Sequence, residues 1–145
     1  MADVYQQAQG LLDAVTARLV DPPERRYVAD GQPAFDCDQV TVHIAGFHRG
    51  TTQTERPTHP AAPASVTAVV TRVWCVPTMT ESGRAPRTVD LERSGATVTA
   101  GAQELWDAVV AAAQSLGCHP AVLGAAPVAP SGGVVGWTVT TQWTI

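Results

Sequence analysis

Histidine and cysteine are the residue types in this sequence best suited to binding a metal ion. They are scattered along the chain, at His43, His48, His59, His119, Cys37, Cys75 and Cys118. A zinc enzyme needs three protein ligands that converge on the ion and leave a further position open. No H-E-x-x-H, H-x-H or C-x-x-C spacing occurs, and SGGVVG at 131–136 lacks the lysine of a phosphate loop. We therefore expect no metal site and no cofactor.

The cysteines are odd in number and widely spaced, which does not indicate a disulfide framework. In a cytoplasmic protein, three buried or half-buried thiols are the ordinary outcome. The alternative is a disulfide between Cys37 and Cys75, which requires that the strands carrying them lie side by side. Cys75 lies in an apolar segment, where burial raises a thiol pKa, so the sequence does not favour it as a nucleophile.

Two carboxylates are spaced as an acid and base pair might be. Asp36 and Asp38 would share one face of a strand, as a general acid and a general base do. The simpler interpretation, which we prefer, is a charged turn at the start of a strand. No serine lies in a G-x-S-x-G context. The sequence therefore predicts no catalytic residue and no enzyme.

The composition limits the classes to which the protein can belong. The 145 residues have the length of one domain, which we place at 1–145, and the apolar fraction of 45% is typical of a globular protein. Lysine is absent, the net charge is −4, and no arginine cluster exceeds two residues, so the basic surface of a nucleic-acid binder is missing. The sequence contains no run of 18 apolar residues, so it predicts no membrane-spanning helix. The first residues have acid where a signal peptide has base, so we expect a cytoplasmic protein.

Two helices are predicted from apolar residues at helical spacing. The first extends from Val4 to Leu19, with Asp3 as its N-cap and two prolines after its end. The second covers 100–116, with Thr99 as its cap and a glycine after its end. Strands are predicted where β-branched residues alternate or run together, with one further short strand in a Gly/Pro-rich connector. These strands are residues 39–45, 66–76, 121–123 and 135–145, and a further short strand is expected at Tyr27 and Val28.

This order of elements predicts an α+β fold. It is a single sandwich of a mostly antiparallel sheet of about four strands, with two helices on one face and a long β-hairpin loop. The core is expected to bury Leu12, Leu105, Val109, Val42, Val70 and Trp137. Two polar segments, 46–64 and 78–97, are too long for simple connections, so we expect them to become ordered only against partner molecules. The interface residues predicted in or near these segments are His48, Arg49, Glu55, Arg56, Arg84 and Arg87.

Several short stretches resemble those of a known family. They are AQGLLDAV at 8–15, VADGQPAFDCDQVTVHI at 28–44, VTRVWCVP at 70–77, LWDAV at 105–109 and PSGGVVGWTVTTQW at 130–143. Together with the order of the elements, they resemble the small tail terminator, or tail completion, proteins found in the neck of long-tailed actinobacterial phages. The resemblance touches most of the chain except the two long polar segments, and none of its motifs is a catalytic signature.

The resemblance implies a structural protein of the virion. Such a subunit forms a ring, typically a hexamer, that caps the tail tube and joins it to the head connector. Its partners would be further copies of itself, the tail tube protein and the connector or stopper protein. The genome DNA would pass through the lumen without specific binding, which suits an acidic chain. The alternatives are another neck component, such as the stopper or adaptor, or the tube protein. From a different class, the alternative is a small-ligand or metal-binding module that uses the loop histidines with Cys37 and Cys75.

Overall fold

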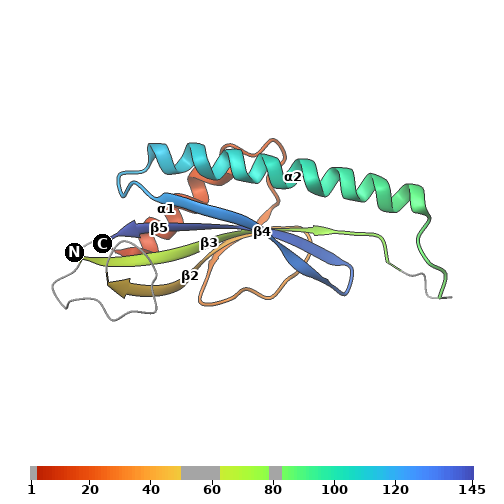
Figure 1. Cartoon of the computed structure of the whole chain (residues 1–145), viewed down its shortest axis with the longest axis horizontal. Helices are drawn as coiled ribbons and strands as arrows, with labels where there is room; N and C mark the ends of the chain where they lie inside the picture. The colour runs from red at the N-terminus through yellow and green to blue at the C-terminus, as the bar shows by residue number, and fades with distance from the viewer. Residues whose placement is uncertain (1–2, 50–62, 79–82) are drawn as a thin grey trace.

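The computed structural model describes residues 3–49, 63–78 and 83–145 and shows two helices lying on one side of a five-stranded sheet (Figure 1). The α+β sandwich predicted from the sequence is therefore confirmed. The elements, in chain order, are α1 (Val4–Thr16), β1 (Arg25–Ala29), β2 (Gln39–Arg49), β3 (Ala64–Cys75), α2 (Thr88–Ser115), β4 (Ala121–Ser131) and β5 (Val134–Thr144).

The sheet has the strand order β1-β2-β3-β5-β4, so β3 is the central strand. Four strands are joined by antiparallel pairings, whereas β1 pairs parallel to β2 over only five residues. The two short strands expected at residues 27–28 and 121–123 are present as β1 and β4, so the sheet has five strands instead of about four. A central strand has neighbours on both edges, and accordingly all but four residues of β3 are buried.

Helix α1 forms as its sequence predicts. The carboxylate of Asp3 accepts hydrogen bonds from the backbone N–H groups of Tyr5 and Gln6 at 2.9 and 3.3 Å, which satisfies two otherwise unpaired donors at the helix start. The helix then buries Leu11 and Leu12 against the sheet. Its position is fixed further by Trp143 of β5, whose indole N–H donates to the side chain of Gln7 at 2.8 Å.

Helix α2 is longer than predicted, because it begins at Thr88 instead of near residue 100. Thr99 therefore lies inside the helix, and the residue at the N-cap is Arg87, whose side chain makes no capping hydrogen bond. Asp90 in the first turn carries the favourable charge for a helix start. The apolar stripe that made the helix recognisable covers only its second half, so the first three turns had no periodic signal.

The last two strands form a hairpin that the sequence predicted only in part. The short strand predicted at 121–123 extends to Ser131, and a two-residue turn at Gly132 and Gly133 connects it to β5. Both glycines have positive φ angles, 55° and 84°, which is the backbone that a tight type I′ hairpin turn requires. Pro127 lies within β4, a position that is tolerated because β4 is the edge strand of the sheet.

The core lies between the two helices and the facing side of the sheet. Five of the six side chains predicted for it are buried: Leu12, Leu105, Val109, Val42 and Val70. The sixth, Trp137, is only partly buried, so that prediction is wrong. Trp137 is paired with Pro127 of the edge strand β4, and α2 covers its side chain only in part. Trp143, nearer the end of β5, is only 2% exposed.

The two long polar segments are shorter in the structure than predicted. Strand β2 continues through Arg49 and α2 takes in residues 88–97, so those parts of 46–64 and 78–97 are ordered within a single chain. The expectation that they need partner molecules is therefore wrong for these parts. Residues 50–62 and 79–82 lie outside the described residues.

Replacement of Leu105 by alanine tests the assignment of the core. Leu105 is fully buried, so Leu105→Ala should lower the free energy of unfolding by about 2–5 kcal/mol through lost burial and the cavity that remains. Leu123→Ala is the matched control, because that leucine is 56% exposed and should cost well under ~1 kcal/mol. Urea denaturation of both variants measures the difference, and equal losses would contradict the assigned packing of α2.

Candidate functional site

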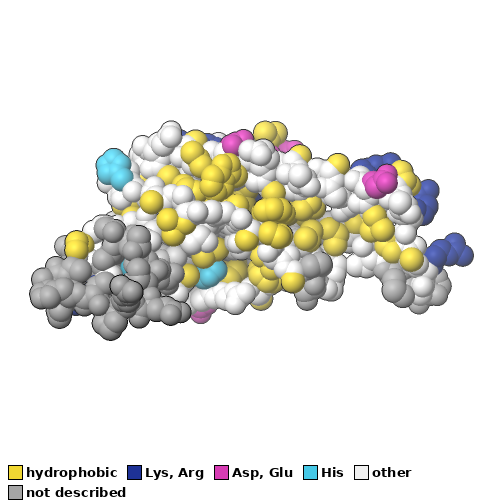
Figure 2. All heavy atoms as spheres, in the orientation of Figure 1, with side chains coloured by type: hydrophobic (Ala, Val, Ile, Leu, Met, Phe, Trp, Pro, Cys, Tyr) yellow, Lys and Arg dark blue, Asp and Glu magenta, His cyan; other side chains and the backbone are white. Residues whose placement is uncertain are grey.

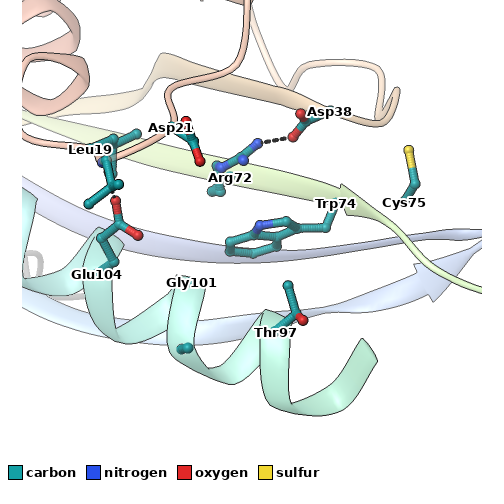
Figure 3. Close-up of a pocket in the computed structure, with 11 residues that line it drawn as sticks. Leu19, Asp21, Asp38, Arg72, Trp74, Cys75, Thr97, Gly101 and Glu104 are labelled. Atoms are coloured by element: carbon teal, nitrogen blue, oxygen red, sulfur yellow. Dashed lines mark hydrogen bonds and ion pairs between the residues drawn. The ribbon is translucent and has the colours of Figure 1, made fainter. Parts of the chain in front are cut away.

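A cleft of about 700 Å³ opens where the end of β3 meets α2 and the connection that follows α1 (Figure 3). One basic, one aromatic and several acidic side chains face it. Its lining residues are Leu19, Val20, Asp21, Asp38, Arg72, Trp74, Cys75, Thr97, Ala100, Gly101 and Glu104.

Arg72 is the central residue of the cleft and is only 9% exposed although it is charged. Its guanidinium pairs with the carboxylate of Asp38, and it also donates to the backbone carbonyl of Val73 at 3.1 Å. A buried charge is costly unless it is paired and hydrogen-bonded. Asp38 therefore holds the start of β2 against β3 as the counter-ion that lets Arg72 face the helices.

Trp74 lies between Arg72 and helix α2. The guanidinium carbon of Arg72 stands 5.0 Å from the centre of the indole ring, which is cation–π distance. On the α2 side, the ring packs against Gly101 so closely that a Cβ atom there would overlap Cζ2 of Trp74 and lie 2.9 Å from Cε2. The glycine therefore allows the helix to cross directly over the indole ring.

A disulfide between Cys37 and Cys75 lies beside this stack. The two cysteines directly adjoin Asp38 and Trp74, so the covalent link joins the same two segments as the ion pair. The expectation of three free thiols is therefore wrong for these two, and neither is available as a metal ligand. Cys118 remains a free, half-buried thiol whose pKa is raised by burial.

Three acidic groups of this region each bind a different part of the chain. Asp36 pairs with Arg25 at 3.2 Å on the surface, while Asp38 pairs with Arg72. Glu104 of α2 accepts a hydrogen bond of 2.6 Å from the backbone N–H of Val20. Among the described residues, no three His, Cys, Asp or Glu side chains are grouped to hold a metal ion.

The predicted interface residues that the structure describes lie on separate elements. Arg87 precedes α2 and binds both carboxylate oxygens of Asp90, at 2.9 and 3.2 Å. Arg49 is exposed at the end of β2, and Arg84 is exposed before α2. Glu55 and Arg56 lie outside the described residues.

The side chain of His48 lies on the face of the sheet that the helices do not cover. That face is polar and largely buried, with Gln39 and Thr41 fully buried among its side chains. Both ring nitrogens of His48 and Nδ1 of His43 are buried without a hydrogen-bond partner within the described structure. Burial lowers the pKa of His43, because desolvation disfavours the charged ring.

A second surface of the molecule is distinctive because it has no charge. From residue 108 to residue 145, the sequence contains no Asp, Glu, Lys or Arg. Edge strand β4 belongs to this stretch, and Leu123 and Ala125 are exposed on it. Natural edge strands usually carry charges, prolines or bulges that prevent association. Here Pro127 and a register shift at Leu123 interrupt the edge, but no charged residue protects it. Sequence reasoning missed this surface, although the uncharged stretch was visible in the sequence.

Two hollows lie between β4 and α2, on either side of Trp106. We call this surface the β4 flank. Figure 2 shows hydrophobic side chains gathered in a band where α2 lies over the sheet, with most of the visible charged groups above the band and at one end. The apolar residues that line these hollows are Ala102, Trp106, Ala113, Pro120, Val110, Val122, Ala125 and Trp137, and exposed Leu123 lies next to them on β4. The polar residues Thr99, Gln103, Gln114 and His119 line the same hollows.

In sequence comparisons, no protein-family model and no curated protein matches the chain. Within the described residues, neither helix is both long enough and apolar enough to cross a bilayer.

The contact between Gly101 and Trp74 can be tested with two glycines of the same helix. Gly101→Ala should lower the free energy of unfolding by about 1–3 kcal/mol, because the new methyl group overlaps the indole ring. Gly95→Ala, with open space around it, should instead raise it by up to about 1 kcal/mol through helix propensity. In a Trp74→Leu background, Gly101→Ala should no longer destabilise. A loss of the same size in that background would contradict the proposed contact.

The contribution of the disulfide is also measurable. Removing a link that spans 38 residues, by Cys37→Ala with Cys75→Ala, should lower the free energy of unfolding by about 4 kcal/mol in the chain-entropy description. Cys118→Ala is the control and should change it much less. Urea denaturation gives the free energy of unfolding of each variant, and the wild-type protein with a reductant should match the double variant. Three titratable thiols in the unreduced, denatured protein would show that the link is absent.

Proposed function

We propose that this chain is a structural subunit that forms a ring at the junction of head and tail in a long-tailed phage. In this role, the ring caps the tail tube and joins it to the head connector or stopper protein. The observation that carries the proposal is the β4 flank, a largely apolar surface without Asp, Glu, Lys or Arg in its lining, beside the edge strand of the sheet. Such a surface is unusual on a monomer and typical of a subunit that associates with other protein surfaces.

The arrangement of the fold supports this role. A ring subunit needs two lateral surfaces and two axial ones, presented by a rigid body. The five-stranded sheet, the buried Arg72 and the disulfide make such a body. The identity of the ring as a tail terminator rests on the resemblance of the sequence stretches given above.

The charge of the chain suits a channel for DNA. The net charge of −4 would not hold phosphate groups as a basic lumen would, so DNA could pass without specific binding. Arg49 and Arg84 are exposed at opposite ends of the described sheet layer, at the end of β2 and before α2. We assign these ends to contacts with the tail tube and the head connector.

The alternative of a small-ligand module has weaker support. Its natural site would be the cleft, whose groups best suited to recognition are Arg72, Asp38 and Trp74. Arg72 already pairs with Asp38 and stacks on Trp74, which in turn packs on Gly101. A ligand would have to displace these contacts, so the cleft is better explained as part of the structural framework.

Deletion of the gene tests the proposed role. Infection without this protein should yield separate heads and tails, or tails of irregular length, in electron micrographs. Complementation by the wild-type gene is the control and should restore joined particles. Labelled protein should be found at the neck of intact virions, whereas a label along the tail would indicate the tube protein instead. Intact, joined and infectious virions from the deletion would overturn the proposal.

A further inference from the structure

We propose that the disulfide between Cys37 and Cys75 is a reversible switch. When closed, it fixes the segment that connects β1 to β2, and when reduced, it releases that segment while the rest of the fold remains. We call residues 30–37 the β1–β2 connection; they follow the end of β1 and approach the start of β2. The inference does not depend on the proposed ring function.

The β1–β2 connection lies on the face of the sheet opposite the helices (Figure 1). The side chain of Gln39 donates to the backbone carbonyl of Ala34 at 2.9 Å, and Gln39 faces that side because the next residue, Val40, belongs to the core under the helices. Cys75 faces the same side, since the indole ring of Trp74, one residue earlier, packs on α2. The disulfide therefore ties the end of the connection to the face on which it lies.

The other contacts of the connection in the described structure are modest. Asp36 pairs with Arg25 at 3.2 Å, but the two side chains are 60% and 55% exposed, and ion pairs at such exposure contribute little to stability. Pro33 is buried, whereas Phe35 is only half-buried. The covalent link is therefore the strongest tie that holds the connection in place.

The face beneath this end of the sheet favours opening. Gln39 and Thr41 are fully buried there, and Oε1 of Gln39 and Oγ1 of Thr41 have no hydrogen-bond partner within the described structure. A buried polar atom without a partner is less stable than the same atom in water. Release of the connection would let water reach this face, while the ion pair of Asp38 with Arg72 would still hold the start of β2.

The disulfide is accessible to small thiols, because Cys37 and Cys75 are both exposed. Exposed disulfides are the ones most easily reduced by exchange. The thiolate of a small-molecule thiol such as glutathione attacks one sulfur, breaks the S–S bond, forms a mixed disulfide and releases the other cysteine as a thiolate. A second small thiol displaces the first cysteine, so the two small thiols supply two electrons and leave as one small-molecule disulfide. The reverse exchange, with that disulfide as oxidant, closes the link again.

The state of the connection would then depend on the compartment. Small thiols keep cysteines reduced in the cytoplasm, whereas disulfides persist in oxidising surroundings. We therefore expect the connection to be released in a reducing compartment and fixed once the protein meets an oxidising one.

The switch can be tested on the wild-type chain in native buffer. Excess reduced glutathione should open the link and excess oxidised glutathione should close it, which alkylation and mass spectrometry detect as three free thiols against one. In the open state, hydrogen–deuterium exchange of the backbone amides in residues 30–37 should become faster by about tenfold or more. The amides of β2 and β3 should keep their protection.

Two variants are the controls. Cys118→Ala keeps the link, so it should switch as the wild type does. Cys37→Ala with Cys75→Ala cannot form the link, so residues 30–37 should exchange fast in both glutathione buffers; slow exchange there would contradict the proposal. If this double variant does not fold, the reduced wild-type protein decides by the same measurement.

Three results with the wild-type protein would overturn the proposal. The first is a link that stays closed in excess reduced glutathione under native conditions. The second is reduction that leaves the exchange of residues 30–37 unchanged. The third is loss of protection throughout β2 and β3 on reduction, which would make the disulfide a permanent link required by the whole fold.

Discussion

A charge buried inside the molecule constrains much of the structure around it. Arg72 faces the helices from the central strand, and the cost of removing its guanidinium from water must be offset by acceptors and close packing. Asp38 supplies the counter-ion and Trp74 supplies a ring to stack on. The indole ring lies so close to α2 that the helix residue facing it must be a glycine, Gly101. The start of β2, the end of β3 and the middle of α2 therefore have one compatible arrangement.

Much of the fold could be predicted from the sequence, because periodic burial leaves a periodic pattern. Helix α1 carries both a cap and an apolar stripe, and β3 is nearly continuous in β-branched residues. The predictions fail for elements that the rest of the protein covers only in part. The buried residues of α2 begin only at Leu105, so residues 88–97 have no complete apolar stripe. Strand β4 is an edge, where glycine and proline are tolerated, so its composition is that of a loop.

The candidate sites could be predicted much less well, because they depend on residues distant in the chain. The pairing of Asp38 with Arg72 joins positions 34 residues apart, and no spacing rule connects them. The disulfide could be predicted only by knowing that the segment of Cys37 lies beside that of Cys75, and the sequence predicts the two segments separately. The β4 flank is different, since the absence of charge after Asp107 is visible in the sequence. The sequence pattern does not show, however, that part of this stretch forms an exposed edge strand.

The uncharged stretch from 108 to 145 also determines how its contacts respond to solution conditions. Ion pairs between exposed groups weaken as salt screens them, with a Debye length of about 8 Å at physiological ionic strength. Contacts made by apolar side chains such as Leu123 and Trp137 have no such dependence, and they strengthen when salts such as sulfate are excluded from the protein surface. Cooling weakens them instead, because apolar burial loses its driving force at low temperature. Any association through this surface would therefore tolerate wide changes in ionic strength and be most vulnerable to cold.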